Sequence, residues 1–264
     1  MDRRPIGVFD SGVGGLTVLK KLKELLPNED YIYFGDTKRV PYGDKPKDEI
    51  EKYARQIVNF MNERNTKIIV IACNTTCASI DKNEYKEILF SVLEAGAESA
   101  ADLTKNNRVG VIATTRTVES GSYEKSIKLK NSNADIFQKA CPGFVPLVEK
   151  GLSESDESFK LAKEYLKTLN DEGIDTLVLG CTHYPILLNA IKNAVREDVL
   201  IVDPAIRLSY DVMNYLKEND MLNLSNGGKT QYFVSGDAKK FADVAKLILN
   251  EDIENVSHVD IDKY

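Results

Sequence analysis

Two nine-residue segments of this chain follow the same pattern and place a cysteine at the same point. They are residues 68–76 (IIVIACNTT) and 176–184 (TLVLGCTHY), and their cysteines lie 181 − 73 = 108 residues apart. Each segment is a run of mainly β-branched residues and Leu, then a small residue, then Cys, then polar residues that can begin a helix. Such runs are typical of buried parallel strands that lead directly into helices. The pattern therefore predicts two equivalent units, each with a cysteine where a strand ends.

The repeat extends beyond the cysteine segments, because residues 6–10 (IGVFD) parallel residues 109–113 (VGVIA) with an offset of 110 − 7 = 103. Strands are expected near 6–9, 31–34, 68–72, 88–92, 109–112, 135–137, 176–179, 199–202 and 231–234, and helices near 16–26, 47–64, 95–104, 158–170, 184–195, 206–217 and 239–249. This alternation predicts an α/β fold of two pseudo-symmetric, doubly wound domains with mostly parallel sheets.

The predicted domains are residues 1–95 plus 208–264, which carry Cys73, and residues 96–207, which carry Cys181. Ligands of open α/β sheets bind beyond the carboxyl ends of the strands. We therefore expect an active site between the two domains.

The charge balance argues against nucleic acid as a partner. The chain has 35 Lys and Arg against 41 Asp and Glu, a net charge of −6, and it has no basic block. No apolar run approaches the ~18 residues of a membrane span, and the N-terminus shows no signal sequence. We expect a cytoplasmic protein whose four cysteines are thiols. A homodimer is the expected assembly, although the sequence does not give its geometry.

The two matched cysteines, Cys73 and Cys181, are the leading candidates for chemistry. Two equivalent units that face each other bring their cysteines to one pocket from opposite sides, and inversion of a stereocentre needs two such groups on opposite faces of one carbon. A thiol between a strand and a helix N-terminus meets N–H groups that favour the thiolate. The alternative is that both are buried and act as small hydrophobic residues. Their matching positions in both repeats argue against that alternative for the pair.

Asp10 opens the segment DSGVGG, residues 10–15, directly after a predicted strand. The glycines suggest a tight turn whose N–H groups face an anion such as a carboxylate, and Asp10 could also be a helix N-cap. A dinucleotide site would need Gly at the third position of G-x-G-x-x-G, where Thr17 stands. Thr114 and Thr115 follow another strand and should lie at the same edge.

Other polar residues stand close to the cysteines or in turns. A carboxylate or imidazole beside a thiol can orient it or set its protonation state, and Glu149 and His183 are the candidates. Groups that could hold an α-amino acid at its two ends are Ser11, Tyr42, Gly43, Asn74, Thr75, Thr115 and Thr182. Ordinary helix capping or a solvated surface charge is the alternative for each.

No metal site is predicted. Cys73 and Cys77 form a Cys-x3-Cys pair, which is a weak zinc signal without a second close pair. Cys77 and Cys141 are expected to be packing residues. The sequence also offers no clear motif for a pyridoxal-phosphate lysine, so no cofactor is expected.

In combination, several motifs resemble those of glutamate racemases, within the cofactor-independent aspartate/glutamate racemase superfamily. They are residues 9–15 (FDSGVGG), 35–43 (GDTKRVPYG), 72–75 (ACNT), 144–149 (FVPLVE) and 180–185 (GCTHYP), and the resemblance covers most of the chain. It implies interconversion of L- and D-glutamate without a cofactor, which supplies D-glutamate for bacterial peptidoglycan.

By the same resemblance, Cys73 and Cys181 are the acid/base thiols. Asp10 would support Cys73, whereas Glu149 and His183 would support Cys181. The resemblance implies that the substrate is held by Asp10, Ser11, Tyr42, Gly43, Asn74, Thr75, Thr182 and His183.

Three other functions stay open. An aspartate racemase would use the same residues on a shorter substrate. A thiol hydrolase would use one nucleophilic cysteine and would leave the second matched cysteine without a role. A non-catalytic module would bind an amino acid without exchanging its α-proton with solvent.

Overall fold

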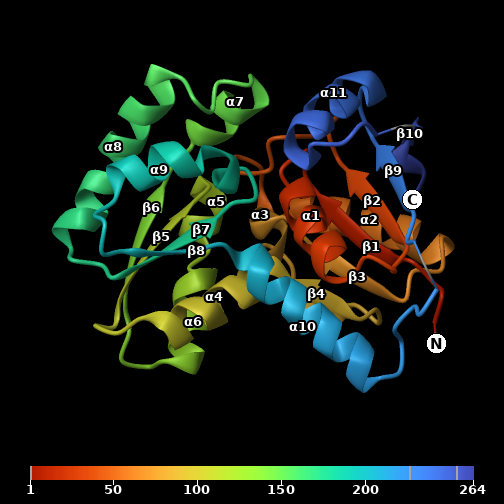
Figure 1. Cartoon of the computed structure of the whole chain (residues 1–264), viewed down its shortest axis with the longest axis horizontal. Helices are drawn as coiled ribbons and strands as arrows, with labels where there is room; N and C mark the ends of the chain where they lie inside the picture. Colours follow the sequence, from red (N-terminus) through yellow and green to blue (C-terminus); the bar gives the residue numbers. More distant parts are fainter. Residues whose placement is uncertain (1, 226, 254) are drawn as a thin grey trace.

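The structure is a computed structural model that describes residues 2–225, 227–253 and 255–264. Its strands form two separate sheets, shown side by side in Figure 1, and all the strand pairs among the described residues are parallel. The strands are β1 (Ile6–Asp10), β2 (Tyr31–Gly35), β3 (Ile68–Ile71), β4 (Leu89–Ser91), β5 (Arg108–Ala113), β6 (Asp135–Ala140), β7 (Thr176–Gly180), β8 (Leu200–Val202), β9 (Thr230–Val234) and β10 (Val256–His258).

Helices cover both sheets. The α-helices are α1 (Leu16–Leu25), α2 (Lys47–Glu63), α3 (Asn74–Cys77), α4 (Val92–Leu103), α5 (Thr115–Glu119), α6 (Ser122–Lys130), α7 (Phe144–Glu149), α8 (Asp156–Asp171), α9 (Leu188–Ala194), α10 (Pro204–Glu218) and α11 (Ala238–Leu249). Short 3-10 helices are η1 (Lys82–Glu84), η2 (Tyr184–Leu187) and η3 (Ile261–Lys263).

The two sheets share one topology. The larger sheet has the order β10-β9-β2-β1-β3-β4 and the smaller has β6-β5-β7-β8. Pairing β1 with β5, β2 with β6, β3 with β7 and β4 with β8 makes β2-β1-β3-β4 equivalent to β6-β5-β7-β8. Cys73 and Cys181 follow β3 and β7, which are equivalent strands. The predicted fold of two similar α/β halves with parallel sheets is therefore confirmed.

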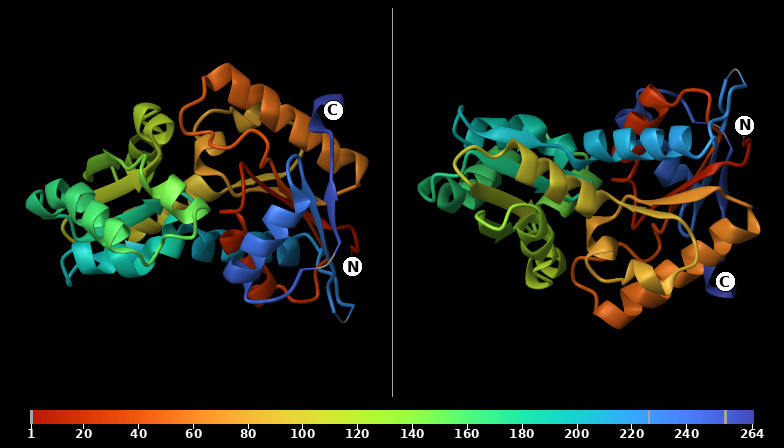
Figure 2. Two further views of the ribbon diagram at one scale, coloured as in Figure 1. Left: turned by 90° about the horizontal axis from the view of Figure 1, so that it is seen from above. Right: turned by 90° about the horizontal axis from the view of Figure 1, so that it is seen from below.

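Two helices link the halves. The chain leaves the larger sheet through α4 and returns through α10, which packs against both α4 and α1 (Figures 1 and 2). Arg207 on α10 pairs with Glu98 and Asp102 on α4. The predicted domain boundaries, 95/96 and 207/208, fall inside these two helices, and where one domain ends along the chain stays a prediction.

The central strands are buried along their whole length. The residues of β1, β3 and β7 are all buried, and helices lie on both faces of each sheet (Figures 1 and 2). A strand that is covered on both faces has no solvent side, so its sequence reads as a continuous apolar run instead of an alternating one. This explains why the two cysteine segments were recognisable as strands.

Short elements were missed. The strand β10 and the helices α3, α5, α6 and α7 were not predicted, because α6 has only two buried residues and the others are six residues long or shorter. The predicted helix 184–195 is divided into η2 and α9, and Pro185 lies in the first turn of η2, a position that tolerates proline. Among the described residues, no helix combines the length and the apolar character that crossing a bilayer requires.

Candidate active site

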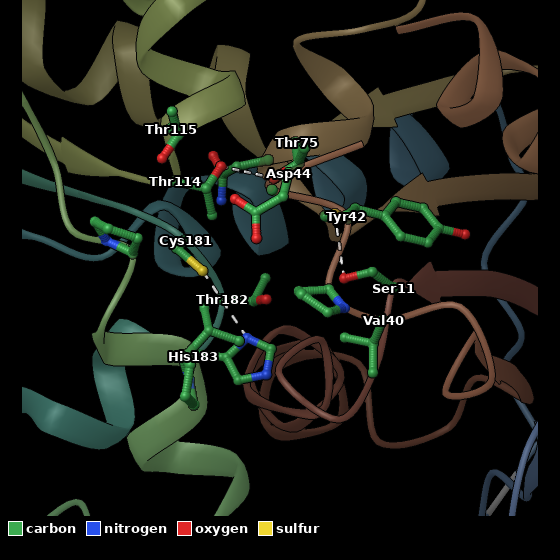
Figure 3. A pocket seen from close by; sticks show the side chains of 17 residues that line it. Ser11, Val40, Tyr42, Asp44, Thr75, Thr114, Thr115, Cys181, Thr182 and His183 are labelled. Atoms are coloured by element: carbon green, nitrogen blue, oxygen red, sulfur yellow. Dashed lines mark hydrogen bonds between the residues drawn. The ribbon is translucent and has the colours of Figure 1, made fainter. Parts of the chain in front are cut away.

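A cavity lies at the carboxyl ends of the strands and is lined from both halves (Figure 3). The cavity volume is about 60 Å³, which suits a small molecule. The lining residues are Ser11, Val40, Pro41, Tyr42, Gly43, Asp44, Cys73, Asn74, Thr75, Thr114, Thr115, Pro142, Val145, Pro146, Cys181, Thr182 and His183. Both matched cysteines thus face one cavity, each from the end of an equivalent strand.

Cys73 is a buried thiol that occupies the N-cap position of α3. Its Sγ–H donates to Ser11 Oγ at 3.6 Å. Burial, and next the negative charge of Asp10, raise the pKa of Cys73 to about 12, although the polar groups of Thr76 and Ser11 next to the sulfur act in the opposite direction. At neutral pH Cys73 is therefore protonated and can act as a proton donor.

Cys181 lies at the other side of the cavity, next to an imidazole–carboxylate pair. His183 Nδ1 is 3.9 Å from Cys181 Sγ, and His183 Nε2 is 2.8 Å from Glu149 Oε1, at the end of α7. Burial by itself lowers the pKa of His183, but hydrogen bonds to Cys181 and Glu149 outweigh it and raise the pKa to about 10. His183 is therefore an imidazolium at neutral pH, which places a positive charge beside Cys181 Sγ.

Asp10 joins the loops of the two halves. It is fully buried at the end of β1, where Oδ2 accepts the Gly12 N–H at 3.0 Å and Oδ1 accepts the Thr182 hydroxyl at 3.3 Å. A Cβ added at Gly14 would lie 2.5 Å from both His183 Nδ1 and Thr182 Oγ1. Only glycine lets the loop after β1 approach the residues that follow Cys181 so closely.

The loop that carries Tyr42 and Gly43 is held by a carboxylate that the sequence analysis missed. Asp36 is fully buried and accepts hydrogen bonds from Tyr42 Oη, from Arg39 Nε at 2.7 Å and from Ser235 Oγ at 2.6 Å. In Figure 3 the Tyr42 ring points away from the cavity. Asp36 directly follows β2 and belongs to segment 35–43, one of the motifs that carried the family resemblance. That position was the signal from which Asp36 could have been predicted.

Thr114 was expected at this edge of the sheet, whereas Thr117 and Asp44 were not predicted. Thr75 Oγ1 is 2.9 Å from Thr114 Oγ1, which is 3.0 Å from Thr117 Oγ1, so hydroxyls from both halves form one cluster. Asp44 and the predicted Thr115 line the same cavity (Figure 3). The sequence placed the pair Thr114–Thr115 at this edge because both residues follow the predicted strand 109–112.

The described residues contain no group of three or more His, Cys, Asp or Glu side chains arranged to hold a metal ion. All four cysteines are free thiols in the structure.

Known proteins share both the sequence and the fold. Residues 6–206 match the family model described as Asp/Glu/Hydantoin racemase. The chain belongs to this family. The glutamate racemase of Thermoanaerobacter pseudethanolicus is 62% identical over 264 residues, which is 100% of both chains.

Solved structures of the family agree with the fold. Glutamate racemase from Francisella tularensis, in complex with D-glutamate, superposes with a TM-score of 0.93 at 38% identity and covers 100% of both chains. The enzyme from Thermus thermophilus, in complex with β-chloro-D-alanine, gives a TM-score of 0.90 at 39% identity, again over 100% of both chains. The family resemblance that the motifs indicated is confirmed.

Proposed function

We propose that this chain interconverts L- and D-glutamate without a cofactor and supplies D-glutamate for peptidoglycan synthesis. The observation that carries the proposal is the pair of cysteines, Cys73 and Cys181, which follow equivalent strands of two like-folded halves and line one small cavity. The full-length similarity to glutamate racemases supports glutamate as the substrate.

The chemistry is proton transfer by two thiols on opposite faces of the α-carbon. A Cys181 thiolate, stabilised by the His183 imidazolium, removes the α-proton, and the Cys73 thiol delivers a proton to the opposite face. Cys181 then carries the proton and Cys73 is the thiolate, so the reverse reaction uses the same groups in exchanged roles. The high pKa of Cys73 and the charge on His183 both favour Cys181 as the initial base. By family resemblance this direction is L to D.

The difficult step is stabilising the carbanion, because proton transfer alone accelerates a reaction only ~10²–10⁴-fold. Preorganised donors in a cavity that excludes water supply further stabilisation. We assign the substrate ammonium to Asp10 and Ser11. The two carboxylates are assigned to the backbone N–H groups of Tyr42 and Gly43 and to donors of Asn74, Thr75, Thr115, Thr182 and His183, with Thr114 added from the structure. A hydrolase that uses one cysteine would give the second cysteine of this cavity no role.

Location and assembly are part of the proposal. Four free thiols suit the reducing cytoplasm. For a homodimer, the supporting feature is the exposed apolar pair Ile206 and Tyr210, one turn apart on α10 and 51% and 49% exposed. Sedimentation velocity tests the assembly, and a dimer is the expected species. A monomer at micromolar concentration would contradict the proposed homodimer.

Circular dichroism of L-glutamate solutions tests the activity. The signal should decay to zero with added enzyme, at the same rate with and without pyridoxal phosphate or a chelator, and deuterium from heavy water should enter Cα. Cys73→Ser and Cys181→Ser should each stop the decay, whereas the control Cys77→Ala, in a cysteine that does not line the cavity, should not. Release of ammonia, or binding of glutamate without exchange at Cα, would overturn the proposal.

A further inference from the structure

Thr76, three residues after Cys73, carries a hydroxyl that the proposed reaction does not yet use. The residue is fully buried, and its Oγ1 has no hydrogen-bond partner. The neighbouring Thr75 hydroxyl is paired with Thr114, and the Ser79 hydroxyl donates to the Thr75 carbonyl. Burying an unpaired hydroxyl costs free energy, and such groups are rare in folded proteins. One that lies beside a reactive thiol therefore needs a reason.

The position of Thr76 relative to Cys73 suggests that reason. Cys73 is the N-cap of α3 with extended backbone angles (φ −79°, ψ 114°), so Thr76 is the third residue of that helix. An N-cap side chain characteristically accepts a bond from the N–H of the third residue, whose own side chain can reach back to the cap. Cys73 makes no such bond as a neutral thiol, which is a weak acceptor. A thiolate in the same place is a charged and much stronger acceptor.

The surroundings of Cys73 offer a thiolate little other support. The titratable groups that interact with Cys73 include Asp10 on β1, Tyr33 on β2 and Tyr42 in the following loop, which are acids. Asp10 raises the pKa of Cys73, and the groups that lower it are the hydroxyl and N–H of Thr76 and the hydroxyl of Ser11. The neutral donors must therefore offset both burial and a neighbouring negative charge.

We propose that Thr76 is a positioning residue whose buried hydroxyl is kept unpaired for the Cys73 thiolate. This rests on the proposed function, in which Cys73 donates a proton. When the Cys73 S–H bond breaks and the proton bonds to the substrate carbanion, the electron pair stays on sulfur. The Thr76 hydroxyl then donates to that sulfur, and it is released when Cys73 takes a proton back.

The second thiol is stabilised by different means. The residue equivalent to Thr76 after Cys181 is Tyr184, whose hydroxyl donates to the Cys141 carbonyl at 3.1 Å. Cys181 has the His183 imidazolium instead. The two halves therefore share a topology but support their thiolates differently, one with a neutral hydroxyl and the other with a cation.

The test is the rate of alkylation by iodoacetamide at each cysteine, resolved by mass spectrometry and measured against pH. Thr76→Val removes the hydroxyl at nearly constant volume. At a fixed pH it should slow alkylation of Cys73 about tenfold, which corresponds to about one pKa unit, and should leave Cys181 unchanged. Thr76→Ser keeps the hydroxyl and should restore the wild-type rate. Cys181 is thus an internal control in the same molecule.

Three results would overturn the proposal: an unchanged rate at Cys73 in Thr76→Val, equal slowing at both cysteines, or no rescue by Thr76→Ser. If Thr76→Val does not fold, Thr76→Ala is measured in the same way. Alkylation does not depend on turnover, so its result separates the two proposals. A wild-type protein that does not racemise glutamate would refute the proposed function whatever the alkylation rates are.

Discussion

Replacing Glu149 with Gln should lower the pKa of His183 without moving its ring. Gln keeps a carbonyl oxygen that can accept the bond from His183 Nε2, which is 2.8 Å from Glu149 Oε1, but it removes the negative charge. The pKa of His183 is about 10 because hydrogen bonds to Cys181 and Glu149 outweigh the lowering effect of burial. The substitution therefore removes one of the groups that keep the imidazolium charged.

The size of the change follows from the kind of hydrogen bond that is lost. A bond to a charged group contributes about 1.5–3 kcal/mol, against about 0.5–1.5 kcal/mol for a neutral one. The Glu149 side chain is 24% exposed, so solvent screening places the difference near the lower end, at about 1 kcal/mol. This corresponds to a decrease of slightly less than one unit in the pKa of His183.

Nitrogen-15 NMR of the imidazole rings measures this pKa directly. The chain has 2 histidines, so the signals are few, and His258→Gln assigns them. His258, whose ring is 3.1 Å from the Ser235 carbonyl, does not line the cavity. In the wild type His183 should stay protonated at pH 8. A wild-type His183 that titrates near 6.5, or a pKa unaffected by Glu149→Gln, would refute the reasoning.

Three further predictions concern the cysteines, the glycine turn and pH. Cys73→Ser and Cys181→Ser should each abolish racemisation, because a hydroxyl is a far poorer base than a thiolate. β-Chloro-alanine loses chloride once its α-proton is removed, so one thiol is sufficient. Cys181→Ser should eliminate chloride from the D form alone, and Cys73→Ser from the L form alone. Racemisation of glutamate by either variant at near the wild-type rate would exclude the two-thiol mechanism. Gly14→Ala should lower kcat at least tenfold and lower the Tm, because its Cβ would meet two atoms of the opposite loop at 2.5 Å. Gly12→Ala, whose nearest contact would be at 3.3 Å, should lower both quantities less. Equal losses in the two variants would contradict this prediction. Because the pKa of His183 is raised in the folded state, its contribution to the free energy of unfolding should be complete below about pH 6.5 and should be lost as the pH rises towards 10. Urea unfolding at pH 6 and pH 9.5 should show this loss in the wild type and a smaller one in His183→Asn, and the same loss in both would disprove it.

The sequence was sufficient for the features that depend on local pattern. The runs before Cys73 and Cys181 read as buried parallel strands because helices cover both faces of each sheet. The glycines after Asp10 likewise read as a close turn, and in the structure a Cβ at Gly14 or Gly15 would lie 2.5 Å from a neighbouring atom. By contrast β10 and α6 were missed, since a short segment with few buried residues takes its conformation from its neighbours instead of from its own propensity.

The pairing of site residues was decided by the tertiary structure. Motifs indicated which residues gather at the strand ends, but not that Asp10 accepts a bond from Thr182, that Asp36 holds Tyr42, or that the Thr76 hydroxyl stays unpaired beside Cys73. The first contact joins residues 172 positions apart, so it exists only once the two sheets face each other. The protonation states depend on the same step, because burial and neighbouring charge, which set the pKa of Cys73 and His183, are properties of the closed cavity and not of the residue types.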